Sequence, residues 1–160
     1  MSASAAFQDQ IPDNRCFGCG PENDRGLQLK SYWEDDVAVS TFVPSPHHMA
    51  GPPHILNGGI IATIIDCHSI CTAIAHAYRM ENRPLGSAPL IWCATASLKV
   101  TYLRPAPIDA PVTLRARIVS ASARKAVVSC SVTSGNEPCA ESEVVAVRVS
   151  ESWRDPGSQS

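Results

Sequence analysis

The sequence is 160 residues long, the usual size of one domain and enough to bury a core without metal or disulfide staples. Apolar residues make up 44% of the chain and charged residues 18%, a balance typical of a globular protein and not of a disordered one. With 13 basic and 15 acidic side chains the formal net charge is −2, so electrostatics give no case for a nucleic-acid-binding protein.

The cysteines and the apolar runs indicate a cytoplasmic protein. No charged-then-apolar leader is visible at the start of the sequence. The longest apolar stretch, residues 60–65, ends at Asp66, far short of the roughly 18 apolar residues of a membrane span. Seven cysteines, an odd number, fit reduced thiols better than a disulfide framework. We therefore expect no membrane contact and a cytoplasmic location.

The first third of the chain predicts a hairpin followed by a long loop. After a flexible segment, residues 1–15, and a turn-rich stretch, the alternation in residues 27–33 predicts a strand, and residues 37–43 predict its antiparallel return. Residues 44–57 form a Pro/Gly/His loop without periodicity, and long loops of this kind are often functional.

The middle of the chain predicts one long helix, from Gly58 to about Tyr78. Apolar and small residues occur on nearly every side of it, which is typical of a buried helix. Asn57 is a good N-cap, and Pro84 and Gly86 interrupt the chain after the helix.

The last part of the chain alternates with a period of two and predicts four strands. Short turns separate them, so we expect antiparallel neighbours; the strands are residues 93–103, 112–122, 125–133 and 139–149. Residues 151–160 are expected to be flexible. One helix against one antiparallel sheet is an α+β layout, assigned to a single domain over residues 16–150. It leaves an edge strand exposed, which a second copy of the chain would cover.

Three segments resemble the hotdog-fold thioesterases of the phenylacetate-degradation (PaaI) type. They are the CFGCG motif of residues 16–20 with Gly26-Leu27, the NGGIIATIID motif of residues 57–66, and ASLKVTYLRP of residues 96–105. The resemblance implies an antiparallel sheet wrapped around one long central helix, hydrolysis of an acyl-CoA or other acyl thioester without metal or cofactor, and a homodimer or dimer of dimers. The family usually has histidine where this chain has Asn57, which still donates a hydrogen bond but cannot protonate a leaving thiolate.

The start of the helix is a candidate for binding the thioester carbonyl. Backbone N–H groups at a helix N-terminus, helped by the helix dipole, suit an oxygen that gains negative charge. Gly58 and Gly59 would leave room for substrate beside Asn57. The same residues also fit an ordinary N-cap with close packing, and the motif alone does not choose between the two.

Asp66 is the strongest catalytic candidate. It lies within an apolar helix with no cationic neighbour three or four residues away, so burial is expected to raise its pKa. A perturbed carboxylate is a functional candidate, as nucleophile or as general base; a structural role is the alternative. By resemblance, Thr95 lies where the family often has a hydroxyl near the attacking water, although a plain strand threonine is equally compatible.

Helix geometry predicts that the site is shared between two subunits. Asp66 is nine residues beyond Asn57, or about 13 Å along the axis, so one thioester cannot easily reach both in one chain. His68 is two residues from Asp66 and faces elsewhere; it would pack or line the acyl pocket. Arg104, by resemblance near the groove for coenzyme A, could bind phosphate, and Lys125 is a weaker candidate. Both also suit solvated surface charges.

Cys16-x-x-Cys19 raises the question of zinc. A structural zinc site usually has four ligands, and the sequence has no second CxxC and no His-x3-His. Cys67 and Cys71 share a helix face but lie on the buried helix. We therefore favour a tight glycine turn with two packed thiols and expect no metal, and metal binding by Cys16 and Cys19 stays open as the alternative.

Two other functions remain open. The first is a non-catalytic acyl-CoA-binding protein of the same fold, an alternative that Asn57 leaves open. A hydratase of this fold would carry an Asp/His pair in a different motif, which is not found here.

Overall fold

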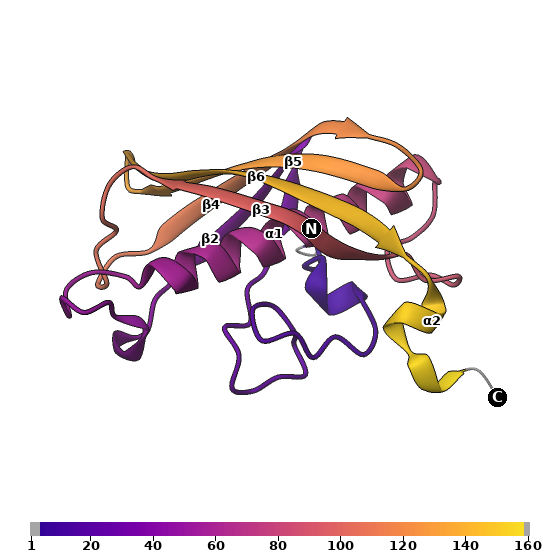
Figure 1. Ribbon diagram of the computed structural model, residues 1–160, viewed down its shortest axis with the longest axis horizontal. Coiled ribbons are helices and arrows are strands. Elements are labelled where there is room, and N and C mark those ends of the chain that lie inside the picture. Colours follow the sequence, from indigo (N-terminus) through magenta and orange to yellow (C-terminus); the bar gives the residue numbers. More distant parts are fainter. Residues whose placement is uncertain (1–3, 159–160) are drawn as a thin grey trace.

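The computed structural model describes residues 4–158, and its centre is one curved sheet of six antiparallel strands over a long helix (Figure 1). The order across the sheet is β1-β2-β4-β5-β6-β3. The strands are β1 Tyr32–Glu34, β2 Val37–Phe42, β3 Trp92–Tyr102, β4 Val112–Ala121, β5 Lys125–Ser134 and β6 Glu137–Val149. This confirms the α+β class and the hotdog arrangement. The long β3 and the three-residue β1 are the two edges of the sheet.

Helix α1, Gly58–Met80, packs against the inner face of the sheet. The alternation of the strands produces that face: along β5 every second side chain is buried, and these are Ala126, Val128, Cys130 and Val132. On the helix Ile64, Ile65 and Ile74 are almost wholly buried. The predicted helix is confirmed and extends two residues beyond Tyr78.

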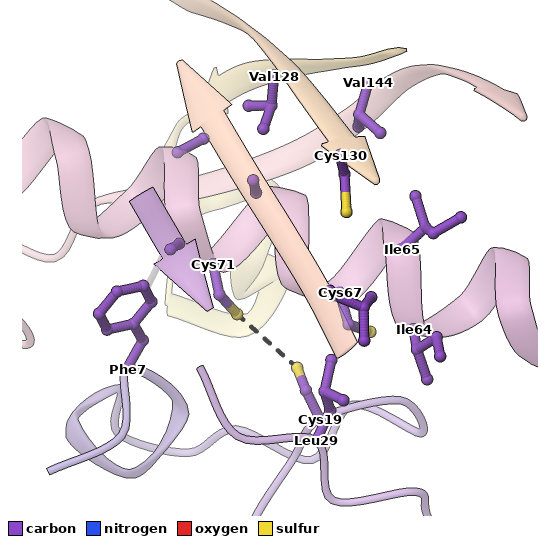
Figure 2. Close-up of a cluster of buried hydrophobic side chains, with 14 of the residues drawn as sticks. Phe7, Cys19, Leu29, Ile64, Ile65, Cys67, Cys71, Val128, Cys130 and Val144 are labelled. Carbon is purple, nitrogen blue, oxygen red and sulfur yellow. Dashed lines mark hydrogen bonds between the residues drawn. The ribbon is translucent and has the colours of Figure 1, made fainter. Parts of the chain in front are cut away.

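The opposite side of α1 is covered by the N-terminal part of the chain (Figures 1 and 2). Phe7, Cys19 and Leu29 are buried in the same core cluster as Ile64 of the helix. This explains why α1 is apolar on nearly every side, because it has a layer on each flank.

The sequence predicts a flexible segment over residues 1–15, and this is wrong for residues 6–14, which pack against the core. Residues 1–3 lie outside the described range. A short 3-10 helix, Gln8–Gln10, follows Phe7, and Gln8, Ile11 and Asn14 are buried. The Phe7 N–H donates to the Ser31 carbonyl. Sparse apolar residues in a polar segment were enough to anchor it.

The strand expected over residues 27–33 is also wrong for most of its length. Leu29 and Ser31 do point inward, as the alternation indicates. However, the N–H groups of Leu27 and Leu29 bond to the carbonyls of Phe17 and Gly18, so this backbone joins the CFGCG loop and not the sheet. Gln28 has a left-handed φ of 51°, which breaks the strand.

Residues 151–158, expected to be flexible, have regular structure. Helix α2, Glu151–Arg154, is capped by the Ser150 hydroxyl, which accepts from the Trp153 N–H, and a 3-10 turn, Pro156–Ser158, follows it. Another 3-10 turn, Pro46–His48, lies in the loop before α1.

Among the described residues, α1 alone has the length and mean hydropathy that a membrane span requires, which the short apolar run 60–65 did not suggest. In this fold 61% of the apolar 18-residue stretch within α1 is buried. Its hydropathy is therefore accounted for by the two layers that cover it.

Candidate active site

Asp66 lies half-buried on α1 and faces the edge strand β3. The Thr95 hydroxyl donates to Asp66 Oδ1 at 2.6 Å. The β3–β6 register shifts between Thr95 and Ser97, and a bulge of this kind redirects side chains beside a site. Burial raises the pKa of Asp66, the Thr95 hydrogen bond lowers it in part, and negative charge at Cys19 raises it. The structure thus pairs the two residues that the sequence placed in catalytic roles.

Asn57 caps α1 with its side-chain oxygen. Asn57 Oδ1 accepts from the N–H groups of Gly59 at 2.8 Å and Ile60 at 3.2 Å, which is the N-cap geometry. Within residues 4–158 no group accepts from the Asn57 side-chain amide or from the Gly58 N–H. The capped helix therefore still has two hydrogen-bond donors for a carbonyl oxygen.

The fold does not need glycine at position 58. A Cβ there would lie 3.6 Å from the Tyr102 ring, an ordinary contact, whereas at Gly59 it would lie 3.0 Å from Asn57 Oδ1. Tyr102, at the end of β3, donates from its hydroxyl to the Gly58 carbonyl at 2.6 Å. Glycine within a helix costs up to about 1 kcal/mol relative to alanine, and packing within the chain does not account for a glycine at position 58.

A shallow groove of about 330 Å³ lies beside this helix start. Gly58, Ile61, Tyr102 and Arg104 are among its lining residues. Arg104 forms an ion pair with Glu137 at 2.5 Å, and both side chains are more than 60% exposed. The guanidinium is available to an anionic ligand only in competition with that carboxylate.

Lys125 lies at the other end of the helix. It lines a separate pocket of about 350 Å³ with Met80 and Glu81, near the C-terminus of α1. Because α1 has 23 residues, its ends are about 35 Å apart. One chain therefore does not bring Arg104 and Lys125 to the same ligand.

His68 is a core residue in this chain. It is 0% exposed; its Nδ1 lies 2.7 Å from Ser31 Oγ and its Nε2 lies 3.0 Å from the Ala38 carbonyl oxygen. Burial lowers the pKa of His68 to about 4. Packing, one of the two roles the sequence allowed, describes this geometry, and contact with a substrate does not.

Two features were missed by sequence reasoning. The Tyr102 hydrogen bond to Gly58 carries no sequence signal beyond a tyrosine at a strand end. The second is a cluster in which Cys16 Sγ and Cys67 Sγ are 3.6 Å apart and Cys19 Sγ and Cys71 Sγ are 3.9 Å apart. The CFGCG loop packs on the face of α1 that carries Cys67 and Cys71, and this brings the four thiols together.

Comparison with known proteins gives the same family. Residues 54–141 match the family model "Thioesterase superfamily". A thioesterase superfamily protein from Shewanella loihica is 34% identical, with a TM-score of 0.63 over 76% of this chain and 91% of that one. The Escherichia coli PaaI protein shares the fold at 13% identity, with a TM-score of 0.63 over 78% of this chain and 81% of that one.

Among curated proteins, mouse acyl-coenzyme A thioesterase THEM4 is 31% identical over 100 residues, which are 62% of this chain. Those residues are 37% of THEM4, so this chain spans well under half of that relative. The family model covers more than half of the chain and includes the Asn57-Gly58-Gly59 turn, Asp66 and Thr95. On these matches, the chain belongs to the thioesterase superfamily, in its hotdog-fold branch.

Proposed function

We propose that this protein hydrolyses acyl-CoA thioesters. The observation that carries the proposal is the Asp66 carboxylate, half-buried with a raised pKa and held by the Thr95 hydroxyl at 2.6 Å. A carboxylate in this state is a stronger base than an exposed one and suits proton abstraction from water. The acyl-CoA thioesterase THEM4, which this chain resembles over 100 residues, supports the class of substrate.

The proposed reaction is a single displacement by water. Asp66 accepts a proton as the water oxygen bonds to the thioester carbonyl carbon. The Asn57 amide and the Gly58 N–H donate to the carbonyl oxygen as it gains charge. The C–S bond then breaks, and the thiolate of coenzyme A leaves and takes up a proton, so the products are a carboxylic acid and free coenzyme A.

The site is proposed to lie between two copies of the chain. Both hydrogen bonds from the sheet to the candidate residues, Thr95 to Asp66 and Tyr102 to Gly58, come from β3. The outer edge of β3 is unpaired in the single chain, and Leu98 on it is 39% exposed. Pairing of two β3 edges would cover this strand and bring Asp66 of one copy toward the Asn57-Gly58-Gly59 turn of the other. Two such dimers could assemble further into a tetramer.

The seven cysteines are free thiols in this structure, which supports the proposed location in a reducing compartment such as the cytoplasm.

The test is thiol release from a panel of acyl-CoA substrates with short, medium, long and aryl acyl groups. We expect turnover of at least one, and Asp66→Asn should lower kcat roughly a hundredfold to ten-thousandfold, as loss of a general base does. The control is Asp24→Asn, which removes an exposed carboxylate in the N-terminal loop and should leave kcat unchanged. A burst of thiol ahead of the steady state would point to an acyl-enzyme on Asp66 in place of water activation.

The second candidate function is acyl-CoA binding without turnover. It is favoured by Asn57, whose side-chain oxygen is occupied by the helix cap and whose amide cannot supply a proton to a leaving thiolate. Binding of acyl-CoA by calorimetry with no thiol release, and the same affinity in Asp66→Ala, would establish the binder and contradict the hydrolase.

A further inference from the structure

Four of the seven cysteines converge at one place, where the N-terminal CFGCG loop meets α1. Figure 2 shows three of them, Cys19, Cys67 and Cys71. Cys16, Cys19 and Cys67 place their sulfur atoms within 4.8 Å of one another. The Cys71 sulfur lies 3.9 Å from that of Cys19. Cys67 and Cys71 are four residues apart on a helix and so share one face, in the way that two helical metal ligands do.

Two sulfur–sulfur distances in the cluster are those of a tetrahedral thiolate centre. Zinc–sulfur bonds of about 2.3 Å in tetrahedral geometry place neighbouring sulfur atoms about 3.8 Å apart. Two sulfur pairs in the cluster, Cys16 with Cys67 and Cys19 with Cys71, are separated by 3.6 and 3.9 Å. Closure on one ion requires the Cys71 sulfur to join the other three.

The loop is shaped around these sulfur atoms. A Cβ at Gly18 would lie 2.2 Å from Cys67 Sγ, so glycine is required for the loop to approach the helix this closely. A Cβ at Gly20 would lie 2.4 Å from the Cys16 backbone nitrogen, so the turn that follows the second cysteine is equally restricted. The Gly20 N–H closes this turn on the Cys16 carbonyl at 2.8 Å.

One side-chain amide donates to the cluster. The buried Asn14 side-chain amide donates to Cys19 Sγ at 3.8 Å. An amide donor of this kind stabilises a thiolate, which is the form in which cysteine binds a metal.

We propose that Cys16, Cys19, Cys67 and Cys71 bind one zinc ion that fastens the N-terminal segment to helix α1. Residues 4–31 contain one 3-10 helix and no strand, so a cross-link there would supply order that regular hydrogen bonding does not. Cys16 is exposed, which gives the ion a path to the otherwise buried cluster. Binding would displace the thiol protons, and four sulfur ligands leave no open position for a substrate, so the role is structural.

The first test measures metal in the purified, reduced full-length protein by elemental analysis. We expect about one zinc ion per chain, falling below about a tenth in Cys16→Ser and Cys19→Ser. The matched control is Cys93→Ser, a buried cysteine on β3 outside the cluster, which should keep its zinc. Equal zinc content in wild type and Cys19→Ser, no zinc in wild type, or iron in its place would overturn the proposal.

The second test does not depend on the folding of any variant. Wild-type protein is unfolded with a chelator and refolded with or without Zn²⁺, and separately with Co²⁺. Refolding with Zn²⁺ should raise the melting temperature, and Co²⁺ should give the sulfur-to-cobalt charge-transfer absorption of a tetrahedral thiolate site. A melting temperature that does not change with Zn²⁺ would contradict the zinc site and indicate packed thiols. An intact mass of the native protein that lacks the hydrogens of two thiols would contradict it too, and would indicate a disulfide.

Discussion

His68 shows how one buried side chain can be mistaken for part of a site. Gln8 Nε2 donates to Ser31 Oγ at 2.8 Å, and the neutral imidazole completes the chain if the Ser31 hydroxyl donates to Nδ1 and Nε2–H donates to the Ala38 carbonyl. Protonation of Nδ1 would make the ring nitrogen a donor, so the Ser31 hydroxyl could no longer donate to it, and a charge would be buried in the core. The fold therefore selects the neutral form of His68.

This selection makes stability depend on pH. The unfolded chain protonates His68 below its ordinary pKa of 6.5, whereas the folded chain does so only near 4, so between these values the unfolded state binds more protons. The free energy of unfolding should thus be unaffected by His68 above about pH 6.5 and should fall by up to about 3 kcal/mol as the pH approaches 4. Urea unfolding from about pH 7.5 to about pH 4.5 measures it.

In His68→Gln the loss of unfolding free energy that His68 causes at acid pH should disappear. The free energy of unfolding should therefore fall less steeply with decreasing pH than in wild type. His47→Gln, at an exposed histidine, should keep the wild-type slope. Parallel profiles for wild type and His68→Gln would show that the histidine is not held neutral.

At the scale of elements, β3 connects the sheet to both halves of the site. It hydrogen-bonds to Asp66 near its start and to Gly58 at its end, while its outer edge has no partner strand among the described residues. A long unpaired strand invites pairing with another chain. The oligomer and the site are therefore expected to depend on the same strand.

Leu98→Lys tests this dependence. A charge buried without a partner at an interface costs several kcal/mol, so the dissociation constant of the dimer should rise roughly a hundredfold or more, and thiol release should fall with it. Light scattering coupled to gel filtration reports the mass. Val119→Lys, on the interior strand β4 at a 62% exposed position, should leave both unchanged. A Leu98→Lys protein that keeps its mass would place the interface elsewhere.

The sequence predicted the elements with strong periodicity and missed those held by irregular contacts. The period-two strands after Pro89 and the apolar helix were recognisable because alternation and burial follow from backbone geometry. Residues 27–31 alternate as a strand would, yet their backbone bonds go to Phe17 and Gly18. The cysteine cluster joins residues about 50 positions apart, a distance over which no local pattern operates. Asp66 and Thr95 could be paired only through family resemblance.

At the scale of the whole molecule, Asn57 and Asp66 are separated by about 13 Å along α1. In the proposed mechanism each complete site therefore takes these two residues from different copies. Complementation tests this directly. Asp66→Ala and Gly59→Val homodimers should both be inactive, the second because its side chain starts 3.0 Å from Asn57 Oδ1 and fills the approach to the turn.

Mixed dimers of these two variants should recover about half of the wild-type activity, because one of the two sites then has both intact halves. Differently tagged chains purified in sequence give verified mixed dimers for the thiol-release assay. No recovery in such dimers would show that each chain carries its own complete site.

The N-terminal layer over α1 has a consequence for where this molecule can be cut. The family model matches residues 54–141, but the face of α1 that carries Cys67, His68 and Cys71 is covered by residues 6–31, which lie outside that match. A chain trimmed to the matched region would present that helix face to water and lose the partners of His68. The smallest autonomous folding unit of this protein is therefore larger than its family signature and includes the segment from Ala6 onward.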